Sequence, residues 1–255
     1  MPEAGTSPKG TQPEGAVSEQ DASRKVREMF TRIAPRYDLL NHLLSGQMDK
    51  RWRARAAREL KPILERADAR VLDLCCGTGD LAFSLARKAK AKVIGADFSH
   101  TMLVRAKEKA ADEANGSAPV PFFEADALHL PFADGSFDLV TTAFGFRNLA
   151  NYEAGLGEIL RVLKPGGSLA ILEFTEPEPG LMGDTYRFYC QKVLPKVGGW
   201  ISGDAAAYAY LPKSVSRFFL PAELKGLMQK AGYRDVRVVL MMLKSVALHV
   251  GAKGS

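Results

Sequence analysis

Apolar positions between residues 70 and 174 follow two alternating patterns. Short, nearly continuous apolar runs predict five strands, at 70–75, Lys92–Asp97, 121–124, Phe137–Ala143 and 168–174. Between them, apolar residues recur at every third or fourth position, which predicts helices at 81–88, 101–113 and 152–163. This alternation is typical of an α/β fold in which a mostly parallel sheet carries helices on both faces.

Beyond the fifth strand, the chain continues with an aromatic-rich segment and then a predicted hairpin. Segment 177–213 is interpreted as an insertion over the binding site, and it contains Tyr186, Phe188, Tyr189, Trp200, Tyr208 and Tyr210. These aromatics form either the core of a lid or an apolar wall for a ligand. A helix is predicted at 220–231, with Gly232 as its stop, followed by strands at Tyr233–Met241 and 244–252.

The N-terminal region divides into a polar segment and a helical one. Residues 1–22 contain few apolar residues, so we expect a disordered tail there. From residue 23 the apolar residues recur at helical spacing until Pro35, and two further helices are predicted at 37–45 and 48–60. Residues 23–255 are therefore predicted to form a single domain in which 23–60 is a helical cap.

Composition narrows the location and the partners. No apolar run reaches the roughly 18 residues needed to span a bilayer, there is no signal-like N-terminus, and three cysteines do not form a disulfide framework. We therefore expect a cytoplasmic protein. The net charge is +6, and basic residues gather at 50–58 beside Trp52. They form either a solvated helix face or a contact with anionic lipid at the inner face of the membrane, with Trp52 at the interface.

The sequence also bears on nucleic acid, metal ions and further copies of the chain as partners. No base-reading module or aromatic stacking motif lies near the basic residues, so we expect no nucleic-acid binding. The sequence predicts no metal site, and it leaves open whether the chain forms a homo-oligomer.

A glycine loop follows the first predicted strand. Residues 71–80 read VLDLCCGTGD, so Gly77 and Gly79 stand between a strand and a helix. Glycines there permit a tight turn and a close backbone approach to a ligand at the helix N-terminus. Asp97 ends the second strand, where a carboxylate can accept both hydroxyls of an adenosine ribose. Asp126 follows the third strand, where it either bonds an adenine amino group or caps a turn.

A dinucleotide fold also satisfies this loose glycine pattern, because Ala82 completes it. Three features argue against that fold. Asp73 lies inside the first strand, where its charge suits a cationic ligand with an amino acid group better than a pyrophosphate. Asp126 and Ala127 follow the third strand, where an adenine amino group could be bonded, and the chain ends in a predicted hairpin rather than a second nucleotide-binding half.

The order of these elements resembles the class I S-adenosylmethionine methyltransferases. The resemblance implies a Rossmann-like, seven-stranded sheet whose last strand is antiparallel, with S-adenosylmethionine as methyl donor. The expected cofactor contacts are Asp73, Gly77, Thr78, Gly79, Asp97, Phe98, Asp126, Ala127 and Ala143.

Three further stretches resemble the menaquinone/ubiquinone biosynthesis C-methyltransferase family. They are Tyr-Asp-Leu-Leu-Asn at 37–41, Phe-Gly-Phe-Arg-Asn at 144–148, and the stretch at 161–167 that continues to Leu-Glu-Phe-Thr at 172–175. The likeness extends over about 26–250. Three positions depart from the family: Asp49 stands in the place of a histidine, Ala143 in the place of a cofactor-contacting serine, and Thr175 in the place of the serine that often ends the third motif.

The resemblance implies methylation at a ring carbon of a prenylated hydroquinone, demethylmenaquinol. A phenol has a pKa of about 10, so the site must favour the phenolate, and Arg147 is the natural electrostatic partner. The alternative is that Arg147 forms a structural salt bridge. Asn148 is expected to orient the second hydroxyl, and the base is Asp49, Tyr210, His42 or water.

Other functions remain open at this point. Alternative substrates are another phenol, a sterol-like lipid, or the 2-polyprenyl-6-methoxybenzoquinol of ubiquinone synthesis. The alternative to an enzyme is a non-catalytic scaffold subunit of a quinone-synthesis complex. The intact glycine loop and Asp97 argue against the scaffold.

Overall fold

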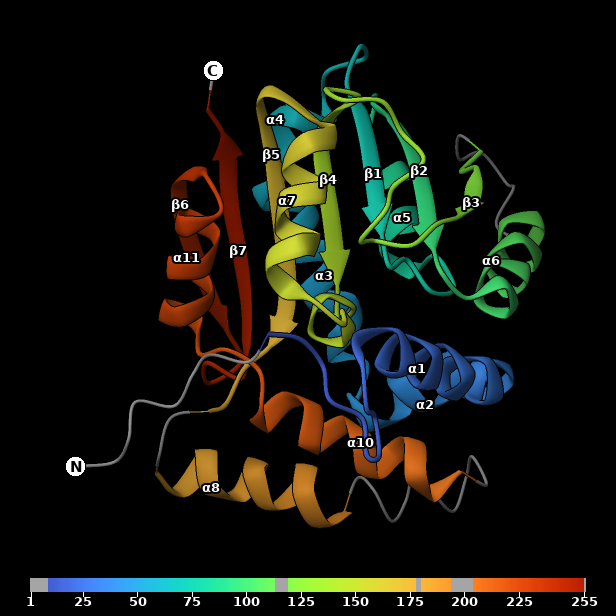
Figure 1. The fold of residues 1–255 in the computed structure, drawn as a ribbon, viewed down its shortest axis with the longest axis vertical. Helices are drawn as coiled ribbons and strands as arrows, with labels where there is room; N and C mark the ends of the chain where they lie inside the picture. Colours follow the sequence, from blue (N-terminus) through green and yellow to red (C-terminus); the bar gives the residue numbers. More distant parts are fainter. Residues whose placement is uncertain (1–8, 113–118, 178–179, 194–203, 255) are drawn as a thin grey trace.

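The computed structural model describes residues 9–112, 119–177, 180–193 and 204–254, and Figure 1 shows a layered α/β domain. The described residues form a seven-stranded sheet of order β3-β2-β1-β4-β5-β7-β6. The strands are β1 (Arg70–Leu74), β2 (Lys92–Asp97), β3 (Phe122–Glu124), β4 (Phe137–Ala143), β5 (Leu163–Phe174), β6 (Tyr233–Met241) and β7 (Val246–Lys253). Strand β7 runs antiparallel to both its neighbours, whereas β1 to β5 pair in parallel. The predicted fold class is confirmed.

Helices cover both faces of this sheet and the edge at which β1 and β4 end (Figure 1). They are α1 (Glu19–Ile33), α2 (Tyr37–Leu44), α3 (Met48–Glu59), α4 (Lys61–Leu64), α5 (Asp80–Ala86), α6 (His100–Asp112), α7 (Tyr152–Val162), α8 (Leu181–Phe188), α10 (Ala205–Ser216) and α11 (Pro221–Lys230). Shorter turns are the 3-10 helices η1 (Ala34–Arg36) and η2 (Phe146–Asn148) and the π-turn η3 (Tyr189–Val193).

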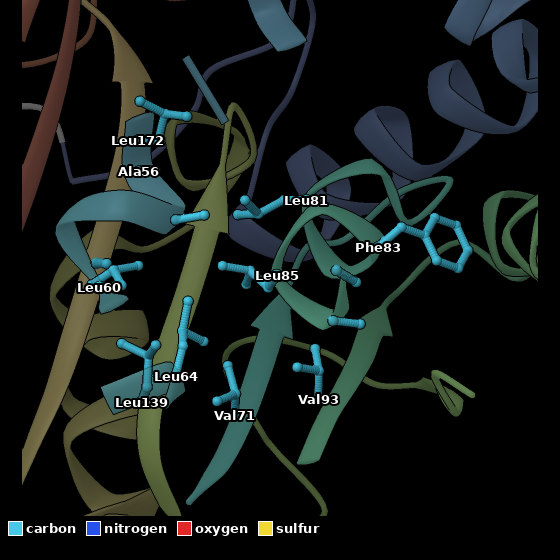
Figure 2. Close-up of a cluster of buried hydrophobic side chains, with 14 of the residues drawn as sticks. Ala56, Leu60, Leu64, Val71, Leu81, Phe83, Leu85, Val93, Leu139 and Leu172 are labelled. Carbon is cyan, nitrogen blue, oxygen red and sulfur yellow. The ribbon is translucent and has the colours of Figure 1, made fainter. Parts of the chain in front are cut away.

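Two buried clusters, one on each face, explain why the strand sequences are almost continuously apolar. Val71 and Leu139 join the cluster under α3, α4 and α5, which Figure 2 shows. The next residues, Leu72 and Val140, point to the opposite face and pack under α7 and α11. All four side chains are fully buried.

Strand β5 begins earlier than the sequence predicts. The stretch Lys164-Pro165-Gly166-Gly167 was expected to be a turn before the strand, but it lies within β5. The pairing with β4 shifts there, from Phe137 opposite Leu163 to Leu139 opposite Ser168. The extra residues are therefore accommodated as an irregularity in the ladder.

The prediction that residues 1–22 form a disordered tail is wrong for residues 9–22. Helix α1 starts at Glu19, capped by Ser18, whose side chain accepts a hydrogen bond from the backbone of Asp21. Before it, the Thr11 N–H donates to the Leu149 carbonyl at 2.8 Å, and Thr11 is buried. Backbone hydrogen bonds thus hold a segment whose side chains contribute little apolar surface. Residues 1–8 lie outside the described residues.

The helical cap and the 177–213 insertion meet above the sheet. Met29 and Ile33 of α1 pack against Ala207 of α10, with Tyr210 at the edge of the contact. Trp200 and the side chains of Tyr186 and Tyr208 lie outside the described residues. No helix in the described part of the chain is long and apolar enough to cross a membrane.

Candidate active site

Two adjoining cavities lie where the parallel strands end and the cap begins. The larger has a volume of about 180 Å³ and the smaller about 60 Å³. The residues that line both are Phe30, Tyr37, Cys75, Gly77, Ala143 and Phe144. In open α/β sheets, ligands bind outside the carboxyl ends of the strands, so this is the expected position of a site.

The glycine loop between β1 and α5 forms the floor between the cavities. Gly77 has a φ of 56°, and the nearest atom to a side chain added there would be Cε1 of Tyr37, 3.9 Å away. Gly77 therefore leaves open space for a ligand. Gly79 is not among the residues that line the two cavities. A side chain there would lie 2.8 Å from Phe83 and 2.9 Å from Phe122, so packing alone requires a glycine, and its role as a cofactor contact stays a prediction.

Asp97 lies at the end of β2 and lines the smaller cavity. Its Oδ2 accepts the Gly77 N–H at 2.9 Å, and its Oδ1 accepts the Ser99 N–H at 2.8 Å. Burial raises the pKa of Asp97 to about 6, against the opposing effect of these N–H groups. Each carboxylate oxygen keeps a free lone pair, so the pair of oxygens can still accept two hydroxyls.

The rest of the smaller cavity is built from α1 and from the residues that follow β2, β3 and β4. Phe98, Asp126 and Ala127 line it as predicted. One oxygen of Asp126 accepts the Leu128 N–H at 2.9 Å, so this carboxylate does shape its own turn as well as facing the cavity. Arg27 of α1 lies over the Phe98 ring, with its guanidinium carbon 5.3 Å from the ring centroid.

Asp73 of β1 lines the larger cavity and is 1% exposed. Its Oδ1 accepts the Thr141 hydroxyl at 2.8 Å, whereas Oδ2 has no hydrogen-bond partner in the described part of the chain. Burial raises the pKa of Asp73 to about 7, against smaller opposing effects of Thr141 and the nearby backbone of Ala82. A buried carboxylate with an unpaired oxygen at a cavity suits a cationic N–H donor.

Thr78 connects the loop to the cap. Its hydroxyl donates to Asp38 of α2 and lies 3.3 Å from the ammonium of Lys109. Lys109 in turn contacts Asp38 at 3.0 Å, as well as Asp80. Sequence reasoning missed Lys109, because it is one of several lysines in an ordinary amphipathic helix, and nothing in its neighbours distinguishes it.

Asp49 is surrounded by donors from α2 and α3. His42 Nδ1 lies 2.7 Å from its Oδ2, Ser45 donates at 2.7 Å, and Arg53 donates at 2.6 Å. Although burial alone would raise it, hydrogen bonds from Ser45 and Arg53 hold the pKa of Asp49 below its usual value. Asp49 is therefore a poor base.

The basic residues at 50–58 do not form one exposed cluster. Trp52 is 3% exposed and packs against Phe144 and Phe174, each at 5.9 Å between ring centroids. Arg53 is buried and also pairs with Asp80 at 3.1 Å. The expectation that Trp52 lies at a membrane interface is wrong, because it fills the core beside the larger cavity. Lys50, Arg51, Arg55 and Arg58 remain exposed.

Arg147 was expected to face a reacting substrate rather than the core, but the structure places it in a buried ion pair. Its Nη1 lies 2.7 Å from Oε1 of Glu173, its Nε donates to Ser214 at 3.3 Å, and its guanidinium lies 5.5 Å from the Phe174 ring. The alternative of a structural salt bridge is thus observed. Arg147 nevertheless lines the larger cavity, and its Nη2 has no hydrogen-bond partner among the described residues.

Tyr210 and Asn148 contact each other between the two cavities. The Tyr210 hydroxyl donates to Oδ1 of Asn148 at 2.9 Å and lies 2.7 Å from the Thr11 hydroxyl. Burial raises the pKa of Tyr210, although the hydrogen bond with Thr11 opposes it. A tyrosine that holds its proton this firmly is a poor base at neutral pH, which argues against the predicted alternative.

Comparison with known proteins agrees with this geometry. The sequence model of the ubiE/COQ5 methyltransferase family matches residues 18–253. A demethylmenaquinone methyltransferase of Thermus thermophilus is 55% identical over 88% of this chain and 99% of its own length. One of Deinococcus radiodurans is 48% identical over 84% of this chain and 87% of its own length.

Among solved structures, a SAM-dependent methyltransferase from Aquifex aeolicus shares the fold, with a TM-score of 0.55 and 23% identity over 76% of this chain and 87% of that one. The family match spans the glycine loop, Asp73, Asp97 and both cavities. This chain therefore belongs to the ubiE/COQ5 methyltransferase family, and its methyl donor is S-adenosylmethionine.

Proposed function

We propose that this methyltransferase methylates a ring carbon of a prenylated hydroquinone, demethylmenaquinol, to give menaquinol. The observation that carries the proposal is the larger cavity, which joins the glycine loop and Asp73 to an apolar wall. Arg147 also lines this cavity, and its Nη2 has no hydrogen-bond partner in the described part of the chain. The names of the Thermus and Deinococcus relatives support the same substrate.

The side chains at the two cavities fit the methyl donor. When bound, S-adenosylmethionine supplies an electrophilic methyl group on its sulfonium sulfur. The free lone pairs of Asp97 would accept the ribose hydroxyls, and the unpaired Oδ2 of Asp73 would accept the ammonium group. Asp126 lines the smaller cavity beside Phe98 and would accept from the adenine amino group.

The larger cavity suits an aromatic head group with an apolar tail. Its wall includes Met29, Ile33, Trp52, Phe144, Phe174, Leu211 and Val215. Such a wall excludes water, which strengthens electrostatic interactions inside it. A hydroquinone oxygen that accepts from Nη2 of Arg147 would ionise more readily, and ionisation makes the ortho carbon a better nucleophile.

The proton of the hydroxyl must leave to an acceptor other than Asp49 or Tyr210. His42 is held through Nδ1 by Asp49, which leaves Nε2 3.9 Å from Oδ2 of Asp80. Of the predicted bases, water and His42 remain, and His42 is not among the residues that line either cavity, so it would act through a water molecule. The variant His42→Gln distinguishes these two possibilities. If kcat/KM has a bell-shaped pH profile in the wild type and the acidic limb is lost in the variant, His42 is the base.

The substrate assignment is tested with the purified protein, S-adenosylmethionine and two reduced short-chain substrates. One is a demethylmenaquinol and the other a 2-polyprenyl-6-methoxybenzoquinol. We expect a higher kcat/KM for the demethylmenaquinol, measured as methylated product by mass spectrometry. A preference for the benzoquinol would assign the ubiquinone step instead, and no turnover of either would contradict the proposal.

We expect Asp97→Ala to weaken S-adenosylmethionine binding by more than about tenfold, because two charge-assisted hydrogen bonds of roughly 1.5–3 kcal/mol each are lost. Asp97→Asn should be milder because one acceptor survives. Calorimetric titration measures both affinities, and Asp134→Ala, on an exposed acid far from the cavities, is the matched control. An unchanged affinity for Asp97→Ala would refute the ribose assignment.

We also propose that the protein contacts the inner face of the cytoplasmic membrane through the exposed cations of α3. Lys50→Glu/Arg51→Glu should reduce co-sedimentation with anionic vesicles at low salt, because each charge contributes about 1 kcal/mol near such a surface. Lys88→Glu/Lys90→Glu changes the net charge equally at exposed positions on another element and should bind nearly as wild type does. Equal losses in both variants would mean that only net charge matters.

A further inference from the structure

The segment at residues 9–17, which we call the N-terminal strap, lies against the residues that follow η2. The Tyr152 N–H donates to the Lys9 carbonyl at 2.8 Å, and the Thr11 N–H donates to the Leu149 carbonyl at 2.8 Å. A side chain at Gly10 would lie 1.8 Å from the Ala150 carbonyl oxygen, so glycine is required for this close approach. The family match begins at residue 18, so the strap lies outside it.

Thr11 begins a chain of hydrogen bonds that leads into the site. Its hydroxyl lies 2.7 Å from the Tyr210 hydroxyl, which donates to Oδ1 of Asn148 at 2.9 Å. A tyrosine hydroxyl has one hydrogen, so Tyr210 cannot also donate to Thr11. Thr11 must therefore be the donor, and the chain runs in one direction, from Thr11 through Tyr210 to Asn148.

The orientation of the Asn148 amide and the direction of this chain go together, because the amide oxygen is the atom that accepts from Tyr210. One N–H of the amide lies toward the Phe144 carbonyl at a long 3.4 Å. The other N–H has no partner among the described residues. Asn148 lines the smaller cavity, next to Arg147 in sequence and beside Phe144, which lines both cavities. Its partner Tyr210 lines the larger cavity, so the amide lies beside both, and its unpartnered group in this orientation is a donor, not an acceptor.

We propose that Thr11 is a positioning residue: through Tyr210 it fixes Asn148 with its N–H toward a hydroquinone oxygen of the substrate. The proposal rests on the proposed function for the identity of that oxygen. Without the Thr11 donor, the Tyr210 hydroxyl can rotate away from Asn148, and only the long 3.4 Å contact with the Phe144 carbonyl then opposes a flip of the Asn148 amide. The flipped amide would place a carbonyl oxygen against the substrate oxygen, which is repulsive once the phenol ionises.

The test compares Thr11→Val, Tyr210→Phe and the double variant with wild type. Valine keeps the shape of threonine and removes only the hydroxyl, while Thr11→Ser keeps the hydroxyl. We expect Thr11→Val to lower kcat/KM for demethylmenaquinol by about three- to tenfold, the scale of one hydrogen bond, and Thr11→Ser to restore it. In the Tyr210→Phe background, Thr11→Val should have no further effect, because the chain is already broken.

Two further measurements separate positioning from packing. The thermal midpoint of Thr11→Val should stay near that of wild type, and its affinity for S-adenosylmethionine should change less than its kcat/KM for the hydroquinone. The side-chain amide signals of Asn148, followed by ¹⁵N NMR without substrate, should shift or broaden in Thr11→Val and recover in Thr11→Ser. An effect of Thr11→Val that persists in full in Tyr210→Phe, or an unchanged Asn148 signal, would overturn the proposal.

The NMR measurement tests the role of Thr11 independently of the substrate assignment. If the wild-type protein methylates no hydroquinone, the substrate assignment fails. The response of the Asn148 signals to Thr11→Val then still decides whether the strap controls the amide. If turnover is normal in Thr11→Val while the Asn148 signals shift, the link from the amide to the substrate oxygen is refuted.

Discussion

Replacing Arg147 with glutamine is expected to lower the free energy of unfolding by about 3–5 kcal/mol, because Glu173 is left as an uncompensated buried charge. Both side chains of this pair are almost fully buried, at 6% and 2% exposed. The same change should slow methylation of demethylmenaquinol by roughly 10²–10³-fold, as when one preorganised charge stabiliser is removed. Urea unfolding and initial rates, corrected for the folded fraction, measure the two effects.

The double variant Arg147→Gln/Glu173→Gln separates these two roles. Removing both charges should recover much of the lost unfolding free energy, because no unpaired charge remains. The rate should stay low, and its deficit should shrink as pH approaches the phenol pKa of about 10. A double variant with normal turnover would show that Arg147 serves the fold alone.

Asp73→Asn is expected to weaken S-adenosylmethionine binding by about ten- to hundredfold, because a neutral amide replaces the carboxylate that receives the ammonium group. The ligand-free protein should become more stable at pH 8. In the unfolded chain Asp73 ionises near its ordinary pKa of 3.8, whereas in the folded chain burial raises it to about 7. The free energy of unfolding therefore falls as pH rises from 3.8 to about 7, because the folded chain disfavours the ionised carboxylate. Asparagine does not ionise, so the variant does not lose this free energy.

The measurement is a pair of thermal scans at pH 8, with roughly 2–4 °C gained for each kcal/mol recovered. Asn retains an oxygen to accept from Thr141, so the variant should fold. A variant that is less stable than wild type without ligand would contradict the assignment of Asp73 as a buried, strained carboxylate.

The pH dependence of binding follows from the same group. Wild-type affinity should be flat above a pH of about 7 and fall roughly tenfold per unit below it, because the ligand requires the ionised carboxylate. Below a pH of about 6, protonation of Asp97 should steepen the loss. Asp73→Asn should remove the change near pH 7 and keep the one near pH 6. Affinity that is constant between pH 6 and 8 would contradict this account.

The sheet could be predicted from sequence because both of its faces are buried. Adjacent residues such as Leu139 and Val140 contribute to opposite clusters, so a central strand such as β4 is a nearly continuous apolar run, which is uncommon in surface elements. Asp97 could also be predicted, because its place at a strand end after the glycine loop depends on local spacing alone. These features need no knowledge of which distant segments meet.

The contacts that could not be predicted join segments far apart in the chain. The segment 48–59 is mostly polar, so its periodicity did not reveal that Trp52 and Arg53 are buried. Arg53 can be buried because its guanidinium forms ion pairs with the carboxylates of Asp49 and Asp80. Glu173 was within a recognised motif, yet its pairing with Arg147 depends on how β5 ends beside η2. The strap was missed because backbone hydrogen bonds, not apolar side chains, hold it.

The central claim is methyl transfer to a ring carbon of demethylmenaquinol. Incubating the purified protein with that substrate in reduced form and S-adenosylmethionine carrying a ¹³C-methyl group, then recording the ¹³C spectrum of the product, tests this claim most directly. The account predicts one labelled methyl with the chemical shift of a methyl group on an aromatic ring carbon, in a product identical to menaquinol. A labelled methoxy signal, or no transfer of label, would contradict it.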